Sequence, residues 1–410
     1  MKTDKHIIRG DDIMKKTIAK KILTLSIWSV AALSMIACGK KEEPATTQAT
    51  TTEAPTTEAT TENPHEGENY NELTGEWSKD YVPHRPIAVM INNLKEALPS
   101  SSTKQADIIY ECMVEGGITR IMPLYSEYSA LEKVGSVRSA RHYYINIANE
   151  YNAIYVHYGQ SKPAKKMLDK KKIDNINGMT YDAGFYRDND RVAPHNAYTT
   201  GERIIQGIKD LGYSDQYSET HEKVLSFNEE DTDLESGDDA DNIVHVNFSN
   251  YSQPYFIYNP EKKIYERYEY NAPQIDNLAD ENDNILTFKN IIVMQSSYEC
   301  INPENDLQEL TQVGEGSGYY ITNGKAVKIK WSKSSKKSKT KYTLEDGSDL
   351  MLNPGKTWIS IIGNGENAGL IFESKSGEQK SGEFTPVQEV TKNADDETAS
   401  DSEADTEAAQ

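Results

Sequence analysis

The chain has 410 residues, of which 36% are hydrophobic, and a formal net charge of −21 at pH 7. This length allows two domains that each have a hydrophobic core. The negative charge is concentrated in segments 42–76, 228–241 and 389–410, which together carry a net charge of −24, so the remaining folded regions are close to neutral. The composition therefore excludes a fold that is acidic over its whole surface. The three cysteines show no spacing typical of metal ligands.

The N-terminal segment, residues 1–37, has the pattern of a secretory signal peptide. Lysines at 15, 16, 20 and 21 precede an apolar run, residues 22–36, and Ala37 stands directly before Cys38. Acidic residues before Met14 are unusual in such a region, so translation could start at Met14. We expect an exported protein that is lipidated at Cys38 and anchored to the outer face of the cytoplasmic membrane, with an uncleaved N-terminal anchor as the alternative. An exported protein is not expected to bind nucleic acid.

Two segments with few large apolar residues flank the predicted folded region. Residues 38–77 comprise Cys38 and a Thr/Glu/Pro spacer, and residues 374–410 form an acidic tail. Both compositions predict disorder, because such segments bury too little surface to offset the entropy lost on ordering. The acidic run 228–241 predicts a linker between two domains.

The first predicted domain, residues 78–227, alternates strand and helix patterns. Runs rich in Ile, Val and Tyr at 86–91, 107–114, 121–125 and 153–158 are typical of strands. Apolar residues in 136–151 recur at helical spacing, and further helices are predicted after Ser161 and Thr200. This order predicts an α/β domain. The second domain, residues 242–373, has short apolar runs separated by Asn, Gly and Pro, which predicts mostly antiparallel β structure.

Several unusual segments occur in a characteristic order along the chain. They are VEGGITRIMPLY, GSVRSAR, YVHYG, YRDNDRVAPHNAY, GSGYYITNGKAVKIKW and LNPGKTWISII. Together they resemble the YerB-like lipoproteins of Gram-positive bacteria, whose domains have no known function. The resemblance implies a secreted protein with an α/β part and a β part, and it implies no particular reaction.

Polar and glycine residues follow three of the predicted strands. In open α/β sheets, ligands bind beyond the carboxyl ends of the strands. The resulting candidates are Asn92, Glu115, Gly116, Gly117 and His157.

The segment GSVRSAR predicts a helix start, with Ser136 as its N-cap. Arg138 and Arg141 would then lie on one helix face, with Ser139 between them. Backbone N–H groups, the helix dipole and two guanidinium groups would bind an anion or a carboxylate. The alternative is that both arginines pair with acidic residues on a solvated surface.

An irregular segment later in the domain concentrates polar residues of the kind found in functional loops. These candidates are Arg187, Asp188, Arg191, His195 and Asn196. Three of the sites named so far also have a structural alternative. His157 and His195 could be hydrogen-bonded loop histidines, and Gly116 with Gly117 could form a turn rather than a phosphate cradle, because no Walker-type lysine accompanies them.

The leading hypothesis is a cell-envelope protein that binds an anionic or carboxylate-bearing ligand, such as a wall polymer or an envelope protein, without a cofactor or metal. A hydrolase or transferase acting on wall material is the first alternative, with Glu115 or Asp188 and His195 as acid and base. Neither a GxSxG nor an HExxH motif is present. A non-catalytic scaffold is the second alternative. The oligomeric state stays open.

Two further features allow more than one interpretation. Cys112 and Cys300 could pair in a disulfide or remain separate thiols, of which we favour the thiols. The lysine-rich segment 325–341 predicts a hairpin, whose lysines either keep it soluble or contact anionic wall polymers or lipid head groups.

Overall fold

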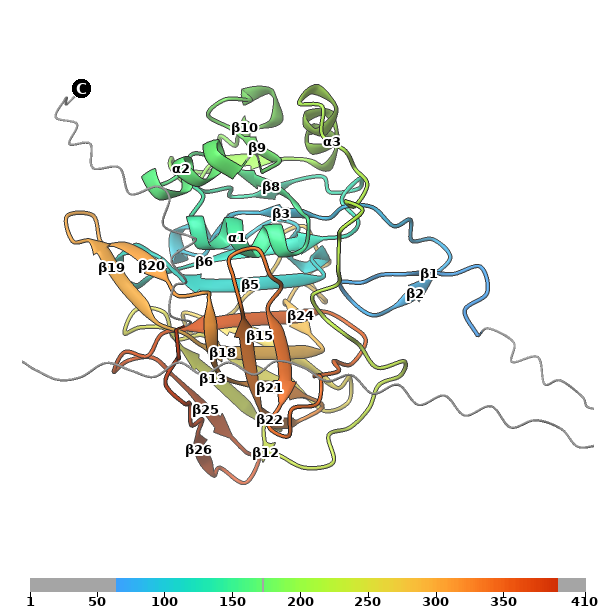
Figure 1. Ribbon diagram of the computed structural model, residues 1–410, viewed down its shortest axis with the longest axis vertical. Helices are drawn as coiled ribbons and strands as arrows, with labels where there is room; N and C mark the ends of the chain where they lie inside the picture. The colour runs from blue at the N-terminus through green and yellow to red at the C-terminus, as the bar shows by residue number, and fades with distance from the viewer. Residues whose placement is uncertain (1–63, 172, 390–410) are drawn as a thin grey trace, which may run out of the picture. The chain divides into compact units, whose positions relative to one another are not determined.

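The computed structural model describes residues 64–171 and 173–389 (Figure 1). The predicted signal peptide, Cys38 and most of the predicted spacer lie outside the described residues. None of the helices in the described part of the chain is long and apolar enough to cross a bilayer.

A twelve-stranded sheet runs through both halves of the chain. The first half contributes β3 (Ile87–Val89), β4 (Ile91–Asn92), β5 (Ile108–Met113), β6 (Thr119–Tyr125), β8 (Ile154–His157) and β9 (Asn175–Asn177). The second half contributes β12 (Asp238–Asp239), β18 (Asn290–Gln295), β21 (Gly314–Thr322), β22 (Lys325–Lys333), β23 (Lys341–Leu344) and β24 (Thr357–Ile362). Strands β5 and β24 are parallel neighbours, with Cys112 opposite Ile361, and they join the two halves (Figure 1).

Strand direction determines where the ends of the first-half strands lie. Strand β6 is antiparallel to both β3 and β5, while β8 is parallel to β3 and to β9. Strands β3, β5, β8 and β9 therefore run in the same direction, and their carboxyl ends lie along one edge of the sheet. This edge is the place where the sequence predicted a ligand site.

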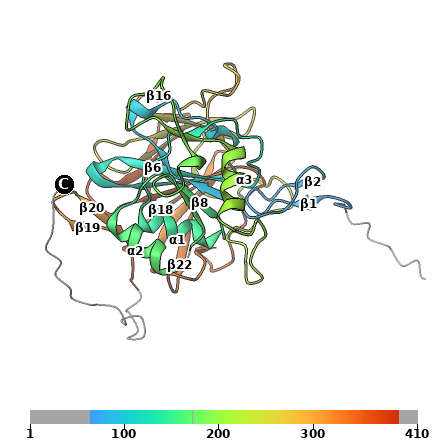
Figure 2. The ribbon, with the colours of Figure 1, turned by 90° about the horizontal axis from the view of Figure 1, so that it is seen from above.

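Three α-helices complete the described residues of the first half. Helices α1 (His142–Glu150) and α2 (Lys162–Lys171) contact each other on one side of the strands, whereas Ile204 and Ile208 of α3 (Gly201–Asp210) join the core on the other face (Figure 2). Thr200 is the N-cap of α3, and its hydroxyl accepts a hydrogen bond from the Arg203 amide at 3.1 Å. Strand–helix order and parallel pairing confirm the predicted α/β character of this half.

The predicted helix start at Ser136 is wrong. Helix α1 begins at His142, and its N-cap is Arg141, which has an extended backbone. The preceding residues are extended because their backbone groups pair with distant segments. The Arg138 amide donates to the Met90 carbonyl at 2.8 Å, and the Ala140 amide donates to the Gly159 carbonyl at 2.9 Å. These long-range bonds override the helical spacing of the apolar residues.

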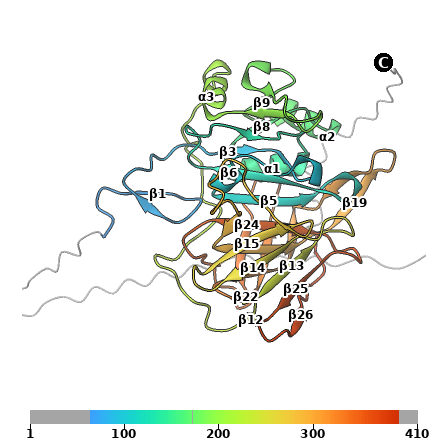
Figure 3. The ribbon, with the colours of Figure 1, turned by 180° about the vertical axis from the view of Figure 1, so that it is seen from behind.

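The second half also forms a separate antiparallel sheet, as predicted. Its strands are β13 (Ile243–Asn247), β14 (Tyr255–Asn259), β15 (Ile264–Glu269), β16 (Ala272–Pro273), β17 (Thr287–Phe288), β25 (Gly369–Glu373) and β26 (Gln379–Ser381). Side chains alternate between buried and half-buried along β13 and β15, as expected for a sheet with one face on the core. Figure 3 shows these strands lying over β24 and β22.

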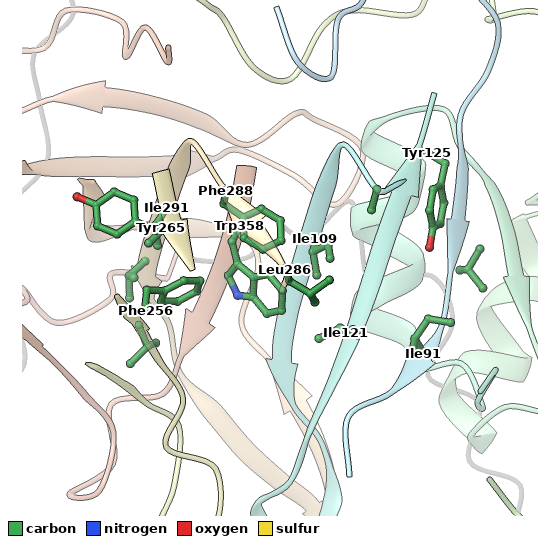
Figure 4. Packing of buried hydrophobic residues seen from close by; sticks show 14 of the residues in the cluster. Ile91, Ile109, Ile121, Tyr125, Phe256, Tyr265, Leu286, Phe288, Ile291 and Trp358 are labelled. Atoms are coloured by element: carbon green, nitrogen blue, oxygen red, sulfur yellow. The ribbon is translucent and has the colours of Figure 1, made fainter. Parts of the chain in front are cut away.

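One hydrophobic core crosses the junction between the halves. Trp358 of β24 is fully buried, and its ring lies 5.0 Å from Phe288 and 5.8 Å from Phe256, measured between centroids. Ile109 and Ile121 continue the same core toward the first half (Figure 4). The described residues belong to a single compact unit.

The fold extends beyond the boundaries predicted for the spacer and the tail. Strands β1 (Asn69–Tyr70) and β2 (Trp77–Ser78) pair before the predicted start of the first domain, and Leu73 between them is buried. After Ser374, β26 pairs with β25, and Gln388 pairs with Glu315 at the start of β21. The remaining residues of the predicted tail, 390–410, lie outside the described residues.

Candidate functional site

Three arginines meet at the edge where the first-half strands end. We call Arg120, Arg138 and Arg141 the arginine cluster. Arg120 lies near the start of β6, opposite Asn92 of β4, whereas the other two lie on the extended segment before α1. A guanidinium N–H of Arg120 donates to the Ser139 carbonyl, and Nη1 of Arg141 donates to the same carbonyl at 3.4 Å. Two like charges therefore converge on one neutral acceptor.

One carboxylate, Glu115, is hydrogen-bonded within the arginine cluster. Both of its oxygens accept hydrogen bonds from Arg141, from Nε and Nη2, each at 2.6 Å. Burial alone would raise the pKa of Glu115, but the hydrogen bonds and charge of Arg141 hold it below its usual value. Glu115 is thus ionised at neutral pH and neutralises one of the three guanidinium groups.

The other two arginines keep hydrogen-bonding capacity that no described carboxylate uses. Arg120 is almost fully buried, and burial together with the charges of Arg141 and Arg138 lowers its pKa to about 9, so it stays protonated at neutral pH. Nη1 of Arg138 donates to the Pro194 carbonyl at 3.2 Å, and its buried Nε has no hydrogen-bond partner among the described residues. The cluster therefore carries an excess of positive charge in a partly desolvated place.

The N-terminus of α1 adds to this positive field. No side chain caps the first turn of α1, and no acidic residue lies in that turn. Uncapped N–H groups at a helix start carry a partial positive charge and favour anions. Burial raises the pKa of the nearby Tyr155 hydroxyl, while the charges of Arg120 and Arg141 act on it in the opposite direction.

The predicted residues Asn92 and His195 lie beside this cluster. Nδ1 of His195 is 2.8 Å from Nδ2 of Asn92. Burial and then the charge of Arg138 lower the pKa of His195, so the ring is neutral at pH 7. The structure thus brings Arg138, His195 and Asn92 together.

The remaining residues of the irregular segment make contacts of their own within the protein. Arg187 donates to the Asn196 side chain at 3.0 Å and lies over the Tyr158 ring, 4.4 Å from its centroid. Asp188 accepts from Lys133 at 2.6 Å, and that hydrogen bond lowers its pKa. Each of these side chains is thereby held in place by the protein itself.

Arg191 anchors the same segment to a neighbouring loop. Its Nη1 and Nη2 donate to the carbonyls of Leu98 and Pro99, at 3.2 and 2.8 Å. Its charge also contributes to lowering the pKa of His195. Arg191 therefore positions the loop and extends the positive field around His195.

His157, Gly116 and Gly117 make the structural contacts that were the alternative to direct ligand binding. His157 is fully buried, with Nδ1 2.7 Å from the Gly159 carbonyl and Nε2 3.1 Å from Oδ1 of Asn175. Gly116 and Gly117 form the turn between β5 and β6, with φ values of 71° and 69° that favour glycine. The Gly117 carbonyl accepts from Ser249 at 2.6 Å, which ties this turn to the second half.

The alternative catalytic residues each contact a different partner. Glu115 binds Arg141, Asp188 binds Lys133, and His195 contacts Asn92. Tyr110, Glu150 and Tyr342 line one cavity of the described part, and residues 222–226 and 339–342 line another. Neither of these two cavities is lined by a predicted site residue. No described group of His, Cys, Asp or Glu side chains could hold a metal ion.

Sequence reasoning missed Arg120 and a buried charge network. Arg120 follows the glycine turn closely, but its neighbours depend on the register of β6 against β4 and β5. The network joins Glu111 of β5 to Arg267 and Glu269 of β15, all buried, with Glu111 to Arg267 at 2.9 Å. Asn93 donates to Glu111 and Glu269 at 3.1 and 2.7 Å. Glutamates inside strands gave the only sequence signal for this network.

The lysine-rich segment and the cysteines also have defined surroundings. Lys325, Lys328, Lys333 and Lys341 pair with Asp239, Glu383, Glu150 and Asp349 respectively. Lys336 and Lys337 are exposed at the turn between β22 and β23. Cys112 is buried and Cys300 exposed, and both are free thiols.

Two family models and two comparisons with single proteins agree on the relatives of this chain. Residues 73–214 match the N-terminal domain, and residues 244–359 the C-terminal domain, of a protein family of unknown function, DUF3048. YerB of Bacillus subtilis (strain 168), whose name describes it as a lipoprotein, is 29% identical over 293 residues, covering 71% of this chain and 85% of YerB. The crystal structure of YerB from Bacillus subtilis has a TM-score of 0.63 and 27% identity, covering 72% of this chain and 96% of that chain.

Proposed function

The chain belongs to the YerB-like family. We propose that it is a lipid-anchored envelope protein that binds a carboxylate- or phosphate-bearing ligand at the arginine cluster. The observation that carries the proposal is the convergence of the Arg120 and Arg141 guanidinium groups on the Ser139 carbonyl, next to Arg138. Only one carboxylate, Glu115, is hydrogen-bonded to these three arginines in the described part of the chain.

The energetic reason is that like charges held together need a counter-charge. Partly buried guanidinium groups repel one another more strongly than exposed ones, because the surroundings screen them less. An anion that entered between Arg138 and Arg120 would relieve this repulsion and would accept charge-assisted hydrogen bonds, such as one from the unpartnered Nε of Arg138. The uncapped start of α1 favours the same charge.

The anchoring part of the proposal rests on the sequence and the relative. The N-terminal pattern that ends at Cys38 and the similarity to YerB, named as a lipoprotein, support attachment to the outer face of the membrane. A spacer after Cys38 would let the arginine cluster reach wall polymers or envelope proteins. Hydrolysis with Glu115 or Asp188 and His195 is less favoured, because these side chains bind separate partners.

The roles of Arg138 and Arg141 differ, and this difference provides a test. Arg138→Gln removes a guanidinium that makes one protein hydrogen bond, to an exposed carbonyl. We expect an affinity loss of about tenfold, roughly 1.4 kcal/mol, with little change in melting temperature. Arg141→Lys should instead destabilise the fold by about 1–2 kcal/mol, because it breaks the two-point bond to half-buried Glu115.

Isothermal titration with a muramyl peptide and with inorganic phosphate measures the affinity loss of Arg138→Gln. Thermal unfolding measures the destabilisation of Arg141→Lys. Lys165→Gln is the matched control, because it removes one positive charge from an exposed pair on α2. Equal affinity of Arg138→Gln and the wild type for both probes would refute ligand binding at the cluster. An equal loss in Lys165→Gln would show that only net charge matters.

A further inference from the structure

The turn between β22 and β23 carries positive charge that the described residues only partly neutralise. We call residues 333–341 the lysine turn; it contains five lysines and no acidic residue. Buried Lys333 binds Glu150, and Lys341 pairs with Asp349 at 2.9 Å. Lys339 donates to the Glu150 backbone carbonyl, while exposed Lys336 and Lys337 have no salt bridge among the described residues. Three of the five lysines therefore form no salt bridge with a described carboxylate, although Glu150, Glu72 and Glu222 lie near enough to Lys339 to act on its charge.

A groove adjoins the lysine turn. Lys339, Thr340, Lys341 and Tyr342 form one wall, residues 222–226 form the other, and Leu350 and Leu352 also line it. Lys223 extends its positive rim, and two carboxylates also line it, Glu222 and Asp349, of which Asp349 is paired with Lys341. Unpaired lysines beside such a groove fit an extended acidic peptide that contains small side chains.

The chain itself supplies such a peptide close by. Residues 390–410 contain seven acidic residues and one lysine, with Ala, Ser and Thr between them. Gln388 pairs with Glu315 of β21, Glu315 pairs with Ser332 of β22, and Ser332 pairs with Lys341 of β23. Neighbouring strands lie about 4.8 Å apart, so Gln388 is about 14 Å from Lys341.

We propose that the acidic segment 395–407 docks on the lysine turn and the adjoining groove of its own chain. A coil as long as residues 390–410 has an end-to-end distance of about 25 Å, which exceeds the 14 Å it must cover. Such a short tether keeps the local concentration of the segment in the millimolar range, so weak ion pairs suffice. The docked segment shields the lysines from other polyanions. This inference does not depend on ligand binding at the arginine cluster.

Carbodiimide cross-linking of the full chain tests the contact, because the reagent joins a lysine amine to a carboxylate only when they touch. Mass spectrometry should find tail carboxylates joined to Lys336, Lys337 and Lys339. The yield should fall at least fivefold in 0.5 M sodium chloride, since salt screens exposed ion pairs.

Two variants test whether charge holds the segment in place. Replacing Asp395, Asp396, Asp401 and Asp405 with Asn leaves Glu397, Glu403 and Glu407 able to react, and their yield with the lysine turn should still fall about fivefold. Lys336→Gln combined with Lys337→Gln should lower the yield at Lys339 in the same way. The lysines of α2 are the internal control. The proposal would be overturned if no tail cross-links formed, or if their yield did not respond to these changes. It would also be overturned if the tail reacted equally often with Lys162, Lys165 and Lys166.

Discussion

At the residue scale, the buried network of Glu111, Arg267 and Glu269 makes stability depend on pH. Two carboxylates share one guanidinium and the amide of Asn93, so both cannot be ionised without cost. Burial, opposed by Arg267 and reinforced by Glu269, raises the pKa of Glu111 to about 7. In the unfolded chain the usual value is near 4.3.

A folded-state pKa above the unfolded one means that the protonated form stabilises the fold. This contribution is complete below pH 4.3 and is lost as the pH rises through 7. At about 1.4 kcal/mol per pKa unit, the free energy of unfolding should fall by up to about 3 kcal/mol between pH 5 and pH 8. Glu111→Gln, a neutral analogue of the protonated acid, should flatten that dependence in urea unfolding, whereas Glu261→Gln on the surface should not. An unchanged pH dependence in Glu111→Gln would contradict this assignment.

Residue roles were the part least predictable from the sequence. Arg138 and His195 were singled out and do lie together, but Arg141 was expected to face ligand and instead holds Glu115. Arg120 was not singled out, because its proximity to Ser139 follows from the register of β6 and from the path of a distant segment. Neither the strand register nor the path of the distant segment can be predicted from local residue spacing.

At the element scale, the predicted strands of the first half are present because their Ile, Val and Tyr runs are buried in the sheet. The helix predicted over 136–151 exists only from His142, because the residues before it hydrogen-bond to Met90 and Gly159. Helical periodicity describes which face is apolar, but it does not detect such long-range pairing. The same limitation placed the predicted tail too early, since β26 is short and polar.

The segment after Glu373 is part of the fold and should contribute to stability. Phe384 packs against Tyr319, the Glu383 amide donates to the Tyr319 hydroxyl at 3.0 Å, and Val387 packs on the core. Ending the chain after Glu373 should lower the free energy of unfolding by about 3 kcal/mol, from one partly buried aromatic ring and several hydrogen bonds. Ending it after Glu389 keeps these contacts and serves as the control. Equal melting temperatures for the two truncated chains would disprove a structural role.

At the scale of the whole molecule, the sheet makes the two halves interdependent. Strand β24 of the second half lies between β18 and β5, and Trp358 on it is buried against residues of both halves. The sequence indicated the two parts correctly, but the shared sheet depends on the pairing of β5 with a strand some 250 residues away, which local patterns cannot reveal.

This shared sheet predicts cooperative unfolding of the described part. Separating the halves would expose the edge of β5 and the Trp358 core, so partial unfolding should be unfavourable. Near-ultraviolet and far-ultraviolet circular dichroism should therefore report one coincident thermal transition. Two resolved transitions would show that the halves unfold independently.

A crystal soaked in selenate would show directly whether the arginine cluster binds an anion. Selenium scatters anomalously, so its position is identified independently of the protein atoms. We expect a selenate ion within hydrogen-bonding distance of Arg138 and Arg120. A muramyl peptide should displace it, and it should be absent from Arg138→Gln crystals. Selenate bound elsewhere at saturating concentration, with none beside Arg138, would contradict the claim.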